Sequence, residues 1–216
     1  MRRESDVFDN TDRLVHKQAM NASPGRPLEF DPDAALDAAM QVFWRNGYEN
    51  TSMQDLLDVM QISKSSLYQA FGGKQALFER CMTRYGDEMI GTLREALQAS
   101  PSGLVFIRQF MESVLDEARG VCEARGCLVL NTANEFARRN PRIAEAVSRG
   151  LNRFHEVLLA AVERAQKEGD ISPQRNASML AMYLVSNMSG LKTMSKAGAS
   201  EKTLKGIIDL TLKALQ

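Results

Sequence analysis

The sequence predicts an all-α fold of about nine helices, and three observations support this prediction. Apolar residues recur with the helical period of about 3.6 residues, and Ala, Leu and Met dominate the composition. Only six prolines occur in 216 residues, so few segments are barred from helix formation. With 44% hydrophobic residues, the chain is long enough for one large or two small buried cores.

Residues 1–25 are expected to form a disordered N-terminal arm. They are polar and lack helical periodicity of useful length, and they end in a Ser-Pro-Gly turn signal. An alternative is that the native protein starts at Met20. No secretory signal and no apolar run of membrane-spanning length is present, so we expect a cytoplasmic protein with no membrane partner.

Residues 26–75 are expected to form a three-helix DNA-binding domain. The first helix begins at Asp31, an N-cap followed by proline, and ends at Gly47. The second begins with a capping-box pattern at Ser52, and the third has Ser63 as its N-cap candidate. Two short helices joined by about three or four residues have the dimensions of a helix-turn-helix.

The polar side of the third helix is the predicted DNA surface. In a helix-turn-helix the second helix of the motif enters the major groove with its N-terminal residues against base edges. The predicted contacts to phosphates or base edges are Arg26, Thr51, Gln54, Lys64, Ser65, Ser66, Tyr68, Gln69 and Lys74. The alternative for these side chains is a solvated helix face, and for Arg26 a solvated linker.

Charge limits how such a domain binds DNA. The chain has 27 basic and 27 acidic side chains, which argues against a non-specific polyanion binder. Residues 23–75 carry four basic and seven acidic side chains, a net charge of −3. Residues 61–74 hold two lysines and no acid, so positive charge is local to the third helix. The negative regional charge supports an alternative function, a helical adaptor without DNA binding.

Residues 76–216 are expected to form a second helical domain. A long helix from Lys74 to about Gln98 would leave the small domain and enter the large one. Further helices are expected at Leu104–Arg119, Glu123–Arg139, Pro141–Lys167, Pro173–Lys196 and Glu201–Leu215.

These segments resemble the TetR family of bacterial transcriptional repressors. The resemblance rests on four runs, VFWRNGY at 42–48, TSMQD at 51–55, ISKSSLY at 62–68 and FGGK at 71–74. A looser match, GCLVLN at 126–131, is similar to the C-terminal domain of one subgroup. Ser65 and Ser66 stand where many members have a glycine, and Ala70 replaces a common histidine or tyrosine, which removes a possible phosphate partner.

The resemblance implies a homodimer that binds double-stranded operator DNA and a small-molecule effector. Its chemistry is binding, so no catalytic residue and no cofactor is expected. Two histidines and scattered carboxylates likewise supply no convergent acid–base set, which argues against an enzyme. The sequence shows no zinc-type Cys/His spacing, so no metal is expected either.

The effector pocket is expected among the middle helices, with an apolar lining and a few polar groups. The candidates are Phe106, Phe110, Met111, Cys127, Asn131, Asn134, Glu135, His155, Met182 and Tyr183. Methionines at helical spacing are also typical of an ordinary core, and a lone histidine is more often structural. The last two helices carry apolar faces for the dimer interface, or alternatively for closing the monomer's core.

The cysteines suggest another interpretation. Cys122 and Cys127 lie five residues apart and close in sequence to Arg119 and Arg125, and nearby cations lower a thiol pKa. The chain would then be a redox- or electrophile-sensing regulator that uses Cys122 or Cys127. The competing interpretation is that these thiols are small core residues. We expect, first, a ligand-responsive repressor that binds a palindromic operator as a homodimer.

Overall fold

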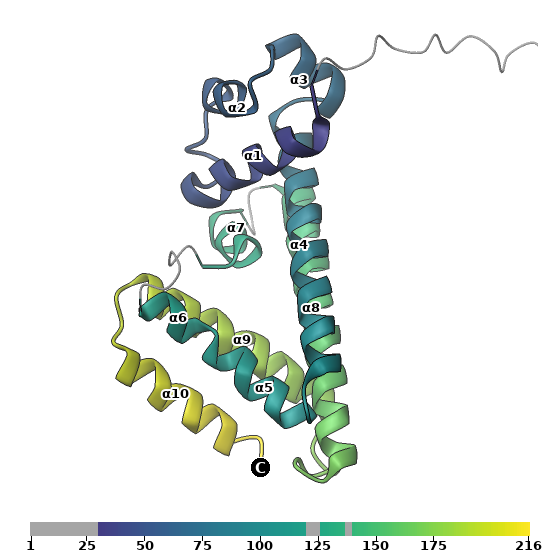
Figure 1. The fold of residues 1–216 in the computed structure, drawn as a ribbon, viewed down its shortest axis with the longest axis vertical. Coiled ribbons are helices and arrows are strands. Elements are labelled where there is room, and N and C mark those ends of the chain that lie inside the picture. Colours follow the sequence, from purple (N-terminus) through teal and green to yellow (C-terminus); the bar gives the residue numbers. More distant parts are fainter. Residues whose placement is uncertain (1–29, 120–125, 137–139) are drawn as a thin grey trace, which may run out of the picture.

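A computed structural model describes residues 30–119, 126–136 and 140–216, and these residues form ten helices. The expected all-α fold is confirmed. The N-terminal helices are α1 (Pro32–Asn46), α2 (Met53–Met60) and α3 (Lys64–Phe71), at the top of Figure 1. The others are α4 (Lys74–Ala99), α5 (Gly103–Glu112), α6 (Val114–Ala118), α7 (Leu128–Phe136), α8 (Pro141–Glu168), α9 (Ala177–Lys196) and α10 (Glu201–Lys213).

Side-chain caps define the starts of the N-terminal helices, as the sequence predicts. Asp31 accepts hydrogen bonds from the backbone N–H groups of Asp33 and Ala34. Ser52 and Asp55 form the complete capping box at α2. These caps satisfy donors that have no partner inside the helix, so each helix boundary is encoded locally.

Two boundaries in the C-terminal part differ from the expectation. The segment expected as one helix over Leu104–Arg119 is divided into α5 and α6 at Ser113, whose hydroxyl donates to the carbonyl of Phe110 at 2.8 Å. Such side-chain bonds compete with helical ones and bend helices. The helix expected from Pro173 starts only at Ala177, because Asn176 is its N-cap. Of the helix expected over Glu123–Arg139, the described residues include α7.

The N-terminal domain shares its core with α4. Phe43, Leu56 and Leu67, one from each of the three small helices, are fully buried in one cluster with Leu77 and Phe78 of α4. The guanidinium of Arg84 adds hydrogen bonds from α4 to the carboxylates of Asp33 (2.9 Å) and Asp37 (3.0 Å) on α1. The position of the small domain therefore depends on α4.

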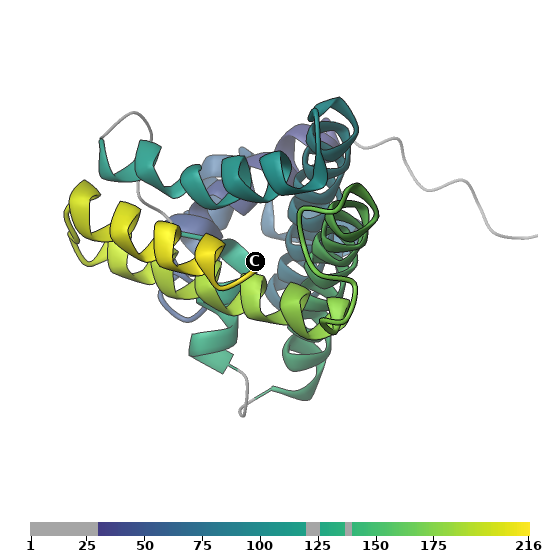
Figure 2. The same ribbon diagram turned by 90° about the horizontal axis from the view of Figure 1, so that it is seen from below.

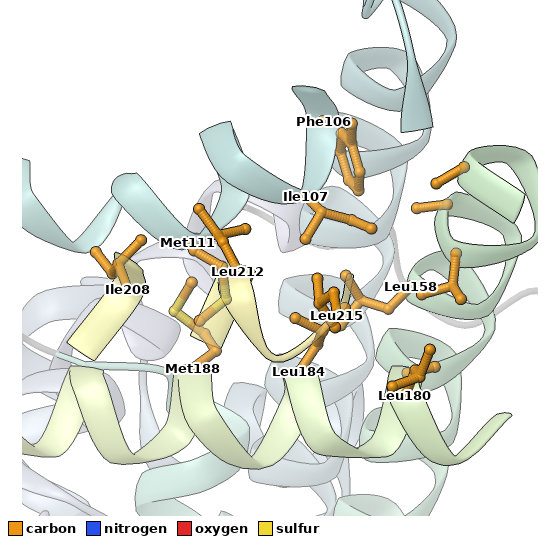
Figure 3. Close-up of a cluster of buried hydrophobic side chains, with 14 of the residues drawn as sticks. Phe106, Ile107, Met111, Leu158, Leu180, Leu184, Met188, Ile208, Leu212 and Leu215 are labelled. Atoms are coloured by element: carbon orange, nitrogen blue, oxygen red, sulfur yellow. The ribbon is translucent and has the colours of Figure 1, made fainter. Parts of the chain in front are cut away.

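Helices α4 and α8 lie side by side along the length of the molecule, as Figure 1 shows. Seen from below, α5, α9 and α10 lie nearest the viewer, and the N-terminal helices lie behind them (Figure 2). Buried side chains of α5, α6, α8, α9 and α10, together with Ile90 of α4, form most of the C-terminal core, which Figure 3 shows in close-up. Among the described residues, no helix is both long and apolar enough to cross a membrane.

Gly103, at the start of α5, lies close to the backbone of α8. A Cβ atom at this position would lie 2.4 Å from the carbonyl oxygen of Ala161 and 2.6 Å from the backbone nitrogen of Ala165. The Gly103 N–H also donates to the Glu168 carboxylate at 2.7 Å. Only glycine allows α5 to pack so closely.

We predict that Gly103→Ala lowers the free energy of unfolding by about 1–3 kcal/mol, because both contacting atoms belong to backbone that must shift. Gly91→Ala in α4 is the control. A Cβ there meets nothing within 4 Å, so the higher helix propensity of alanine should raise stability by up to about 1 kcal/mol. Urea unfolding measures both changes, and equal effects would contradict the close-packing argument.

Candidate DNA interface and effector cavity

Helix α3 presents the predicted DNA surface. Its apolar residues Leu67 and Phe71 are buried against the domain core. Lys64, Ser65 and Gln69 are exposed. Tyr68 retains 50% of its surface in solvent, an unusual exposure for a large aromatic side chain. These four side chains are available to a partner on the outer face of the domain.

The serines at the start of α3 form a local hydrogen-bond cluster. Ser63 caps the helix by accepting from the backbone N–H of Ser66 at 3.1 Å. Its hydroxyl also lies 2.8 Å from the hydroxyls of Ser65 and Ser66. Each hydroxyl can both donate and accept, so these side chains can exchange internal bonds for bonds to a phosphate or base edge.

The other predicted DNA contacts lie in different environments. Thr51 is fully buried, and its hydroxyl donates to the Gly47 carbonyl at 2.6 Å, so it holds the turn between α1 and α2 rather than facing outward. Gln54 is exposed on α2 and donates to Asp58 at 2.7 Å. Arg26 lies outside the described residues.

Lys74 is the first residue of α4 and follows α3 closely in the chain. Its ammonium lies 4.3 Å from the centroid of the Tyr48 ring, and α4 has no side-chain N-cap, which leaves its first N–H groups without that partner. The preceding Gly73 has a φ of +113°, and a Cβ there would lie 3.2 Å from the Tyr68 ring. Glycine at this position thus allows α3 and the start of α4 to lie close together.

A cavity of about 550 Å³ lies between the C-terminal helices and the end of α1, a volume typical of small-molecule sites. Most of its wall is apolar. The lining residues are Trp44, Tyr85, Met89, Thr92, Leu93, Phe110, Ser113, Glu117, Gly126, Cys127, Leu130, Leu151, Phe154, Leu158, Val185, Met188 and Lys192.

Of the predicted pocket residues, Phe110 and Cys127 lie in this wall. Asn131 and Glu135 line a neighbouring cavity of about 330 Å³ that reaches the end of α1. The side chain of Asn134 lies outside the described part of the structure.

The remaining candidates lie outside both cavities. Phe106 and Met111 are buried in the C-terminal core, because the face of α5 that carries them packs against other helices (Figure 3). Met182 and Tyr183 are exposed on α9. The Nε2 atom of His155 lies 3.1 Å from the Ser178 hydroxyl and 3.2 Å from its carbonyl oxygen, which is a structural contact.

Sequence reasoning did not identify Trp44, Glu117 or Lys192 as residues of the cavity wall. Trp44 is not among the predicted site residues, yet its indole N–H donates to the Gly126 carbonyl at 3.1 Å across the domain boundary. Glu117 of α6 and Lys192 of α9 form an ion pair in the wall. They are 75 positions apart in the chain, and no local pattern pairs them.

The two described thiols are buried. Burial raises the pKa of Cys81 to about 12, and its thiol donates to the Leu36 carbonyl. Burial also raises the pKa of Cys127. Both environments favour the unreactive thiol over the thiolate. Cys122 lies outside the described residues.

Glu135 connects α7 to the turn between α1 and α2. Its carboxylate accepts from the backbone N–H of Glu49 at 2.9 Å and of Tyr48 at 3.3 Å. A Cβ at Gly47 would lie 2.9 Å from the same carboxylate, so glycine keeps this approach open. Helix α7 thus lies between the two parts of the molecule. Leu130 near its start lines the larger cavity, and Glu135 in its last turn contacts the N-terminal domain.

These features define a class of protein, an all-helical regulator with a helix-turn-helix and a separate ligand cavity. Comparison with known proteins agrees. The model of the tetR family of bacterial regulatory proteins matches residues 35–81, and that of the tetracyclin repressor-like C-terminal domain matches residues 103–210. The chain belongs to the TetR family of transcriptional regulators, which are not enzymes.

Individual relatives support this assignment over the whole chain. The chain is 30% identical to the HTH-type transcriptional regulator YezE of Bacillus subtilis, covering 88% of this chain and 99% of that protein. It is 27% identical to the repressor ComR of Escherichia coli, over 91% and 94% of the two chains. A solved structure of the regulator CifR, a cysteine mutant complexed with 26bp double-strand operator DNA, superposes with a TM-score of 0.75 at 27% identity, covering 89% and 100%.

We predict that the two buried thiols resist modification. In a Cys122→Ser variant, Ellman's reagent at pH 8 should react at least about a hundredfold more slowly with the native protein than with the urea-unfolded chain. The reason is that an ordinary thiol is partly ionised at this pH, whereas a thiol with a pKa of about 12 is ionised in about one molecule in 10,000. Fast native labelling at Cys127, located by peptide mass, would instead support thiol sensing.

Proposed function

We propose that this protein is a ligand-responsive transcriptional repressor that binds a palindromic double-stranded operator as a homodimer. The exposed polar face of α3, beside the N-terminus of α4, carries the proposal, because it puts lysine, hydroxyl and amide groups on one surface of a helix-turn-helix. CifR, at 27% identity, has been solved with operator DNA. A palindromic site follows from two-fold symmetry of the protein.

An exposed apolar face on α9 supports the homodimer. Met179, Met182 and Tyr183 follow each other at helical spacing and retain 68%, 49% and 37% of their surface in solvent. Leu210 of α10 is 67% exposed as well. A second copy of the chain would cover this surface, and two recognition helices would then read the two half-sites of an operator.

The cavities suggest how an effector would act on DNA binding. Trp44, Cys127, Lys192 and Leu130 of α7 belong to the walls of both cavities, and Glu135 lies in the wall of the smaller one. A ligand in the larger cavity would therefore contact α7, which holds the α1–α2 turn through Glu135. The ligand would release the operator to the extent that it binds more tightly to a conformation in which the Glu135 contact with the α1–α2 turn is altered.

The DNA proposal is tested with Lys64→Ala and a palindromic duplex recovered by in vitro selection from randomised DNA. Loss of one phosphate or base contact per protomer should weaken binding roughly tenfold and reduce the slope of log K against log salt by about 1–2. Lys167→Ala, which removes an equal charge at the exposed end of α8, should change neither quantity.

Fluorescence anisotropy at two salt concentrations measures both the affinity for the duplex and its dependence on salt. Wild-type protein that binds no duplex, or binds random DNA as well as the selected one, would overturn the repressor proposal and favour the helical adaptor without DNA binding.

Glu135→Ala tests the connection between the domains. Loss of the carboxylate should speed hydrogen exchange at the Tyr48 and Glu49 amides, which then lack their acceptor. Binding to the selected duplex should weaken by about five- to tenfold, because the freed domain must be ordered on the DNA. Glu156→Ala, at an exposed position of α8, is the control. Faster amide exchange with unchanged DNA affinity would show that this contact does not influence DNA binding.

A further inference from the structure

We propose that the effector is an uncharged, largely apolar alcohol or phenol whose hydroxyl group binds the Glu117–Lys192 pair. This inference rests on the proposed effector cavity and adds the chemical class of its ligand. The hydroxyl would donate to the second carboxylate oxygen of Glu117 and accept from the ammonium of Lys192.

Glu117 has an unused hydrogen-bond acceptor. Its Oε1 atom is paired with the Lys192 ammonium, and its side chain is only 7% exposed. Its Oε2 atom is buried and has no hydrogen-bond partner among the described residues. A buried carboxylate oxygen that lacks a donor has lost the bonds that water would supply, so a donor brought by a ligand stabilises it.

Other polar side chains of the wall already donate hydrogen bonds to backbone carbonyls. The Thr92 hydroxyl donates to the Glu88 carbonyl at 3.0 Å, and the Ser113 hydroxyl donates to Phe110 in the same way. The indole N–H of Trp44 donates to the Gly126 carbonyl. Within the described part of the wall, Oε2 of Glu117 is therefore the buried side-chain oxygen that lacks a hydrogen-bond partner.

The pair favours a neutral ligand. Lys192 already balances the charge of Glu117, so a ligand ammonium would add an uncompensated positive charge to a mostly apolar cavity. A ligand carboxylate would lie beside the Glu117 carboxylate, which is like-charge repulsion. The Lys192 ammonium has three N–H donors. Its bond to Glu117 does not occupy all of them, so Lys192 can also donate to a ligand oxygen. A hydroxyl group is both donor and acceptor and satisfies both partners.

The rest of the wall selects an apolar body. Met89, Leu93, Phe110, Leu151 and Phe154 surround the space with aliphatic and aromatic groups. A cavity of about 550 Å³ accommodates a ring system of two or more rings. Burial of such a body supplies the affinity, and the single hydroxyl supplies the orientation.

Trp44 makes this inference measurable, because it is the only tryptophan of the chain and lies in the cavity wall. Its fluorescence is titrated at pH 7 with four probes that do not absorb at its excitation wavelength: decalin, the corresponding alcohol, the amine and the carboxylic acid. The alcohol should bind at least about tenfold more tightly than each of the other three. An amine, acid or plain hydrocarbon that binds as tightly as the alcohol would overturn the inference.

A double variant, Glu117→Leu with Lys192→Met, removes the pair and keeps apolar volume. It should bind decalin about as well as the wild type, which shows that the cavity remains, and the preference for the alcohol should fall to about twofold or less. Thr92→Val, which removes a wall hydroxyl bonded to its own helix, should keep the preference. A preference that survives in the double variant would also overturn the inference.

The outcomes separate this inference from the proposed function. If no probe binds the wild-type protein, the effector cavity itself is overturned, and the hydroxyl site with it. If the probes bind without preference for the alcohol, the cavity stands as a ligand site, and only the hydroxyl site is overturned. Should the double variant bind no probe at all, the single variant Lys192→Met decides, because it leaves Glu117 without its charge partner and should shift the preference from alcohol to amine.

Discussion

Helix α4 and the three N-terminal helices share one hydrophobic core, and this shared core sets the position of the small domain. Three helices of 15, 8 and 8 residues bury too little surface to be stable alone, and Leu77 and Phe78 of α4 complete their core. The same helix continues past Tyr85 and Met89 into the cavity wall. Because one rigid element belongs to both sites, the position of α3 is tied to the walls of the cavity.

A second connection runs through α7. The indole N–H of Trp44 donates to the Gly126 carbonyl, and the Glu49 N–H of the α1–α2 turn donates to the Glu135 carboxylate of α7, so both hydrogen bonds cross the boundary with the N-terminal domain as donor. Since Trp44 lines the cavity, a ligand there would contact the N-terminal domain directly. The cavity and the N-terminal domain are thus neighbours in space.

Polar groups were easier to predict from the sequence at the DNA surface than in the cavity. Lys64, Tyr68 and Gln69 are exposed because helical periodicity alone turns them away from Leu67 and Phe71. The burial of Thr51 could not be predicted in this way, because its hydroxyl can donate to the Gly47 carbonyl only after the turn between α1 and α2 has formed. Phe106 and Phe110 are chemically alike and four residues apart, yet one lies in the core and the other also in the cavity wall. Composition does not distinguish the two environments, since both are apolar.

Most of the helices and their caps, the helix-turn-helix and the family were predictable from the sequence, because each rests on periodicities and capping bonds between residues close in the chain. Tertiary structure alone decided where the cavity lies and which polar groups enter it. Glu117 and Lys192 meet because α6 packs on α9, and Trp44 reaches Gly126 across 82 positions. Such contacts depend on how whole helices pack, and no local pattern encodes that packing.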